Sequence, residues 1–147
     1  MNSADLIRKH CECLELPQDA TDFVCLIWQM NQRFDDMVDE PEKLTREDQD
    51  ALIWDSFVTL PTNPFYLRHL GTLSPVLALV ISKWKASDTA EREGRHDARS
   101  FVWRAGFYDV LLMVYTLIHG PGAAMRDAET ILGLYGENLD DYMREFD

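Results

Sequence analysis

Apolar side chains recur every three or four residues along most of the chain, which is the spacing of amphipathic helices. Residues 21–40 predict one such helix, which ends before Pro41. Its apolar positions are Val24, Ile27, Trp28, Phe34 and Val38. A further helix follows the pair Thr45 and Asp48, which resembles a capping box. Its apolar positions are Ile53, Trp54, Phe57 and Leu60.

Start and stop signals divide the rest of the chain into helices. Asn63-Pro64 and Ser74-Pro75 each look like a helix start, so residues 63–93 form either one kinked helix or a short helix before a long one. Further helices are predicted at about residues 3–14, 97–119, 123–135 and 138–146. No alternating strand pattern is present. We therefore expect an all-α bundle of about six or seven helices.

The helix predicted over residues 97–119 is apolar on every side. One side carries Trp103, Phe107, Val110, Val114 and Leu117, and the other carries Phe101, Ala105, Tyr108, Leu112 and Tyr115. A helix that is apolar all round is a buried helix. We expect it to be the central helix of the bundle, with Asp109 and His119 as polar groups on it.

Length and charge narrow the classes of function. The chain has 147 residues and no long linker, which predicts a single domain over residues 1–147. Twenty-six acidic residues against fourteen basic ones give a net charge of −12, so nucleic-acid backbone binding is not expected. No secretory signal or membrane-length apolar run is present, and we expect a soluble cytoplasmic protein without a membrane partner.

An aspartate cluster near residue 35 supports a metal-site hypothesis. Asn31, Asp35 and Asp39 stack on successive turns of the predicted helix. Asp35 projects close to Val24, near the middle of the apolar side, whereas Asp36 projects about 100° away. An inward carboxylate needs a cation, a proton or a hydrogen-bond network. Carboxylates one turn apart suit Mg²⁺ bound to diphosphate oxygens, so magnesium is the cofactor if the cluster is a metal site.

The string over residues 35–39 resembles two families of diphosphate enzymes. It is similar to the first aspartate-rich motif of isoprenyl diphosphate synthases, although Asp140-Asp141 does not supply the second motif. With Asp in place of Glu, it is also similar to the acidic helix of all-α nucleotide pyrophosphohydrolases of the MazG and dimeric dUTPase type. Residues 47–50 have the spacing of that family's second motif, but a helix cap also explains them. The alternative is that the aspartates pair with buried groups and have a structural role.

Two histidines complete the candidate enzymatic site. If the two long helices are antiparallel, His119 at the end of one approaches His69 near the start of the other. Either histidine is then a candidate general base beside metal-binding Asp35, Asp36, Asp39 and Asp109. The alternative for each histidine is a satisfied core residue. Whether the protein is an enzyme stays open at this level, and no motif for another cofactor is present.

The acidic residues also support a non-enzymatic hypothesis. Residues 35–50 hold eight acidic and two basic side chains, and residues 137–147 hold five acidic and one basic. Such surfaces steer basic proteins toward them. We therefore expect an accessory protein that acts as a protein-binding or regulatory module for a basic partner. A structural or assembly component is a further alternative, and a buried helical interface would allow a homo-oligomer.

The order of several motifs resembles small all-helical proteins encoded by tailed bacteriophages. The resemblance spans about two thirds of the chain. It is carried by Trp28, Phe34-Asp35-Asp36 with Asp39, the string Leu60-Pro61-Thr62-Asn63-Pro64-Phe65-Tyr66, Leu73-Ser74-Pro75, Trp84 and Glu91. It implies an accessory role in the host cytoplasm but no particular activity.

Overall fold

The computed structural model describes residues 2–147, and every regular element among them is a helix. The all-helical class predicted from the sequence is confirmed. The chain divides into two compact units, Met1–Leu70 and Gly71–Asp147. The predicted single domain over residues 1–147 stays a prediction.

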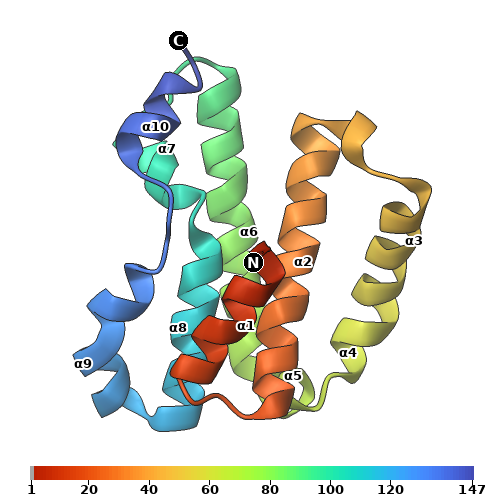
Figure 1. The fold of residues 1–147 in the computed structure, drawn as a ribbon, viewed down its shortest axis with the longest axis vertical. Coiled ribbons are helices and arrows are strands. Elements are labelled where there is room, and N and C mark those ends of the chain that lie inside the picture. Colours follow the sequence, from red (N-terminus) through yellow and green to blue (C-terminus); the bar gives the residue numbers. More distant parts are fainter. Residues whose placement is uncertain (1) are drawn as a thin grey trace. The chain divides into compact units, whose positions relative to one another are not determined.

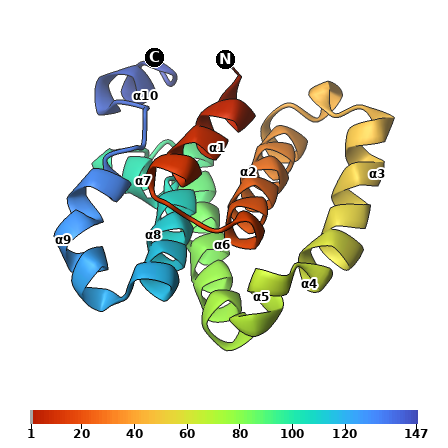
Figure 2. The same cartoon turned by 60° about the horizontal axis from the view of Figure 1, so that its bottom comes forward.

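The first unit is built around α2. Its elements are α1 (Ser3–Cys13), α2 (Gln18–Asp39), the short η1 (Pro41–Lys43), α3 (Arg46–Trp54), the π-helical η2 (Asp55–Thr59), α4 (Leu60–Thr62) and α5 (Pro64–Arg68). Figures 1 and 2 show α1 lying against α2, and α3 running beside α2 in the opposite direction. The buried residues of α2 all lie between Ala20 and Met30, so the core of this unit is at the N-terminal half of α2.

The second unit begins one residue into α6 (Leu70–Arg92) and contains α7 (Ala98–Trp103), α8 (Gly106–His119), α9 (Pro121–Leu132) and α10 (Leu139–Arg144). The chain rises along α6, returns along α8, and α9 packs on α8 (Figure 1). The last helix, α10, packs on α7. Residues far apart in the sequence are therefore brought together at the α7–α10 contact.

The helix predicted over residues 97–119 is broken into two, and only its second part, α8, is buried as expected; in α7, Val102 is 57% exposed. No residue between Gly106 and Ile118 is exposed. The break at Arg104 and Ala105 separates α7 from α8 and was not predicted. At Gly106 a Cβ atom would lie 2.7 Å from Cγ1 of Val80, so the glycine permits a close approach between α6 and α8. The start of α8 therefore coincides with a close tertiary contact.

Most helix starts follow the capping signals. Asn63, Asp97 and Asn138 each accept a hydrogen bond from a backbone N–H in the first turn of the helix that follows. Residues 63–93 form a short helix and a long one, as the second alternative predicted, but the division is at His69. Pro75 does not start a helix and lies inside α6.

Candidate functional site

The segment of residues 46–62, here called the α3 arm, is one continuous helical stretch made of α3, η2 and α4. Thr45 and Asp48 form the predicted capping box: the Asp48 N–H donates to Thr45 Oγ1 at 3.0 Å, and the Thr45 N–H donates to Asp48 Oδ2 at 3.1 Å. Pro61, near the C-terminal end of the arm, has no backbone N–H and therefore cannot donate a helical hydrogen bond. Just before it the helix widens, and the Leu60 N–H bonds the carbonyl of Asp55 five residues back.

One side of the α3 arm attaches it to α2. Leu52 is buried with Leu26 and Met30 of α2, and Leu60 packs against this cluster. Nη1 of Arg33 lies 3.0 Å from Oδ2 of Asp55, and both side chains are mostly buried. The inward side of the arm is therefore held by a small apolar contact and one well-placed ion pair.

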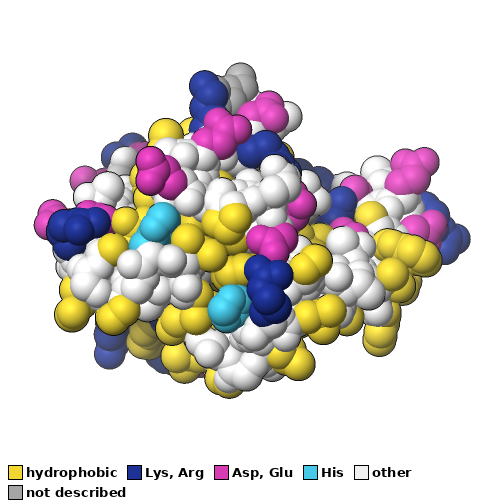
Figure 3. Space-filling model, turned by 90° about the horizontal axis from the view of Figure 1, so that it is seen from below, with side chains coloured by type: hydrophobic (Ala, Val, Ile, Leu, Met, Phe, Trp, Pro, Cys, Tyr) yellow, Lys and Arg dark blue, Asp and Glu magenta, His cyan; other side chains and the backbone are white. Residues whose placement is uncertain are grey.

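The other side of the α3 arm presents large apolar side chains to solvent. Ile53 and Trp54 are each 61% exposed and Phe57 is 78% exposed; these three residues are here called the apolar row. Figure 3 shows hydrophobic side chains at the surface on the right, where α3 lies in Figure 1, next to charged ones. An amphipathic helix normally turns its large apolar residues toward the core. The arm has apolar residues on two sides: Leu52 and Leu60 face α2, and the apolar row faces solvent. An exposed apolar patch of this kind is characteristic of a binding surface.

Covering the apolar row with another apolar surface would be favourable in free energy. Fully burying a side chain such as Phe or Ile stabilises by about 1.5–3 kcal/mol. Ile53 and Trp54 are already partly covered, so a partner that covered the apolar row would gain the part of this free energy that belongs to their exposed surface and to that of Phe57.

Acidic groups precede the apolar row on the exposed side of the arm. Asp50 lies three and four residues before Ile53 and Trp54, and Glu47 lies three residues before Asp50, so these side chains share a face. Both carboxylates are exposed and neither has an ion-pair partner within residues 2–147. Arg46 is exposed on the same face, four residues before Asp50. The start of the arm therefore carries two carboxylates and one guanidinium on this face, and the apolar row follows them.

The aspartates proposed to bind a metal lie beyond the core. Asp35 and Asp36 are half-buried and Asp39 is exposed, near the C-terminal end of α2. The buried stretch of α2 ends at Met30, so Asp35 lies beyond the fully buried part of the helix. The expectation that its carboxylate points inward stays a prediction. Within residues 2–147, no group of three or more His, Cys, Asp or Glu side chains is arranged to hold a metal ion. The metal assignment has no structural support and stays a prediction.

The other residues proposed for the enzymatic site are Asp109, His69 and His119, and each contacts a different neighbour. Asp109 accepts a hydrogen bond from Nζ of Lys83 at 2.6 Å, so an ammonium group already neutralises it. The His69 ring packs on Phe65 in the first unit, and the His119 ring packs on Tyr115 in the second. The proposed approach of the two histidines stays a prediction.

Two of the three cysteines form a buried thiol pair. Cys11 of α1 and Cys25 of α2 are joined by a hydrogen bond, and all three cysteines are free thiols. The hydrogen bond from Cys11 lowers the pKa of Cys25 to about 7 and, together with burial, raises the pKa of Cys11. The pair lies where α1 packs on α2 and forms part of that packing.

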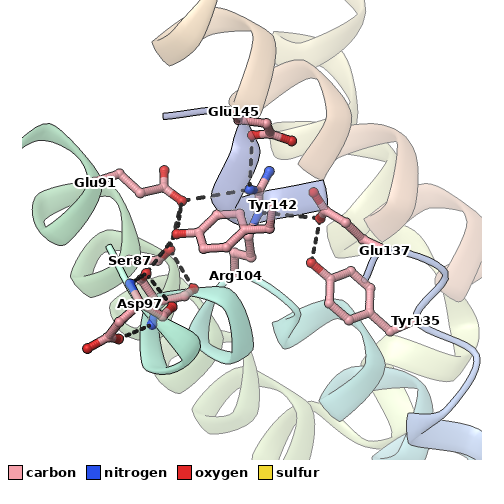
Figure 4. A network of polar contacts seen from close by, with 9 residues as sticks. Ser87, Glu91, Asp97, Arg104, Tyr135, Glu137, Tyr142 and Glu145 are labelled. Carbon is pink, nitrogen blue, oxygen red and sulfur yellow. Dashed lines mark hydrogen bonds and ion pairs between the residues drawn. The ribbon is translucent and has the colours of Figure 1, made fainter. Parts of the chain in front are cut away.

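The densest polar network lies in the second unit around Arg104. Its guanidinium is within 3.7–3.8 Å of carboxylate oxygens of Glu91, Glu137 and Glu145. The same guanidinium lies 5.0 Å from the centre of the Tyr142 ring, and Figure 4 shows it among these groups.

The Tyr142 hydroxyl links this network to α6 and α7. It lies 2.7 Å from Oγ of Ser100 and donates to Oε2 of Glu91 at 2.7 Å. Ser87 in turn donates to the carbonyl of Ser100 at 2.8 Å. Burial raises the pKa of Tyr142 to about 12, because phenolate is disfavoured away from water. These groups satisfy one another, so the network has a structural role in docking α10.

Comparison with known protein families, with curated proteins and with solved structures finds no match to this chain. No helix among the described residues is long and apolar enough to cross a membrane.

In the sequence, Ile53, Trp54 and Phe57 served only to locate a helix, and their exposure was not predicted. A signal for them was present. Leu52, Ile53 and Trp54 are consecutive, and three consecutive helical residues span about 200° of the helix surface. A helix lying against one neighbour cannot bury all three, so at least one large apolar side chain had to face outward.

Proposed function

We propose that this protein is a protein-binding module whose binding surface is the apolar row of the α3 arm. The observation that carries the proposal is the exposure of Ile53, Trp54 and Phe57 together on one helix. Aromatic side chains of this kind are the residues that most often dominate binding energy in protein interfaces. The acidic side chains of the first unit support a basic partner, as the charge pattern predicts.

The cellular location that we propose comes from the sequence resemblance to helical proteins encoded by tailed bacteriophages. We place the module in the cytoplasm, and in the host cytoplasm if the chain is phage-encoded. No specific observation favours the magnesium-dependent diphosphate enzyme or the assembly component over the binding module, and both remain alternatives from the sequence.

A photo-crosslinking experiment tests the proposal. A photoreactive phenylalanine analogue is placed at Phe57, and in a matched protein at Met125, which is also 78% exposed but lies in the second unit. Both proteins are irradiated in an extract of the cells that naturally make the chain. We expect a discrete adduct at position 57 that is missing at position 125.

The adduct is then identified by mass spectrometry, and binding of the purified partner is measured directly. The proposal predicts that the partner binds the wild-type chain and binds the Phe57→Ala variant at least about tenfold more weakly. Equal adducts at the two positions, or equal affinity of the two proteins, would contradict it.

A further inference from the structure

We infer that the apolar row takes a basic amphipathic helix, with its apolar side on Ile53, Trp54 and Phe57 and its Lys or Arg residues facing Glu47 and Asp50. This inference rests on the proposed function and adds the chemical class of the partner.

The dimensions of the surface favour a helix as the occupant. The exposed apolar side chains continue from the row to Val58 and Pro61. At a rise of about 1.5 Å per residue, the stretch from Ile53 to Pro61 is about 12 Å long, a little over two helical turns. An amphipathic helix presents apolar anchors at positions i, i+3 or i+4, and i+7 over the same length.

The negative charge of the first unit favours a basic partner. The first unit holds fourteen acidic and six basic residues, a net charge of −8. Glu47 and Asp50 stand on the exposed face of the arm without an ion-pair partner among the described residues. Cationic side chains beside the row would pair with these two carboxylates at the edge of the contact, where water still screens them and desolvation costs little.

The same charges disfavour the other occupants of an apolar surface. A second copy of the chain would bring another net charge of −12 against this one, with acidic residues meeting acidic residues. Phosphate-bearing surfaces, whether nucleic acid or anionic membrane, meet the same repulsion. A basic helix is the occupant that satisfies both the apolar row and its charged neighbours.

The test uses synthetic peptides and the full-length chain. The probe is a fluorescein-labelled peptide of about 18 residues, made of Leu at helical i, i+3, i+4, i+7 spacing and Lys elsewhere. One comparison peptide has Glu in place of Lys, and another has the Leu/Lys composition in an order that breaks the helical spacing. Affinity is measured by fluorescence anisotropy.

We expect the patterned Leu/Lys peptide to bind with one-to-one stoichiometry. The Phe57→Ala variant should bind it at least about tenfold more weakly, while Met125→Ala binds as the wild type does. The double variant E47Q/D50N should lose affinity, and raising salt from about 50 mM to about 500 mM should weaken its binding less than that of the wild type. Circular dichroism melting checks that every variant is folded.

Each of the other outcomes overturns the inference. If the Glu peptide binds as tightly as the Lys peptide, the partner need not be basic. If the Leu/Lys peptide without helical spacing binds as tightly as the patterned one, the interaction depends on net charge and not on an amphipathic helix. A dimer seen by sedimentation and lost in Phe57→Ala would make a second copy the occupant. If peptide binding fails while crosslinking at Phe57 still yields a partner, the binding function stands and the partner is of another class; if crosslinking fails as well, the proposed function itself is wrong.

Discussion

The α3 arm and α8 are both rich in large apolar side chains, yet they place them in opposite surroundings. In α8 no residue from Gly106 to Ile118 is exposed, whereas the arm turns Ile53, Trp54 and Phe57 into solvent. Phe107 is 5% exposed and Phe57 is 78% exposed, although both are phenylalanines on helices. Apolar residues in α8 hold the fold together, and those of the apolar row are available for binding.

The largest predicted effect is on the buried phenylalanine. Phe107→Ala removes a packed ring from α8, and we expect it to lower the free energy of unfolding by about 3–5 kcal/mol. Urea unfolding followed by circular dichroism measures this loss. Phe107→Leu, which keeps most of the volume, should cost clearly less; a small effect of both changes would mean that α8 is not tightly packed.

The Arg104 network gives the next largest effect. Arg104→Gln leaves Glu91, Glu137 and Glu145 near one another without their cation, and we expect a loss of about 2–3 kcal/mol because the arginine side chain is only 24% exposed. Thermal melting of Arg99→Gln is the control, since Arg99 is exposed and, within residues 2–147, forms an ion pair with Asp97 alone. Similar melting temperatures for the two variants would contradict a structural role for Arg104.

Tyr142→Phe should have a smaller effect that depends on pH. Losing the hydroxyl removes hydrogen bonds to Ser100 and Glu91, which costs about 1–2 kcal/mol near neutral pH. The pKa of Tyr142 is raised from 10.0 to about 12 in the folded chain, so its stabilising contribution is complete below pH 10 and is lost as pH rises toward 12. Urea unfolding between pH 8 and pH 11 should therefore show a steeper loss in the wild type; parallel pH profiles would contradict the assignment.

Removing a helix cap should act locally in each unit. Thr45→Ala breaks the capping box of the α3 arm, and Asn138→Ala removes the cap of α10. Each change should cost about 1 kcal/mol. Hydrogen–deuterium exchange should rise in the arm for the first variant and in α10 for the second. A rise in exchange at both places in either variant would show that the cap effects are not local.

The sequence predicted the helices well because their start signals are local. The Thr45–Asp48 capping box, Asn63 before Pro64, and the Asp97 and Asn138 caps are all short motifs that act within one turn. The break at Arg104 and Ala105 is different, since it accompanies the close approach of Gly106 to Val80. A contact between residues 26 positions apart has no signature in helical periodicity.

The candidate site was the harder part to predict. Periodicity places apolar residues on one side of a helix but does not reveal whether a neighbour covers that side. Phe34 and Val38 follow the same repeat as Val24, yet they are exposed because they lie beyond the core of the first unit. For the same reason, periodicity did not reveal that the apolar row is exposed.

The most direct test of the account is to measure the stability and the binding of one variant, Phe57→Ala, together. We predict that its free energy of unfolding stays within about 0.5 kcal/mol of the wild type. Its affinity for the patterned Leu/Lys peptide should fall at least about tenfold, with Met125→Ala unchanged in both measurements. A Phe57→Ala variant that unfolds much more easily, or that binds the peptide as well as the wild type, would contradict the assignment of the apolar row to binding.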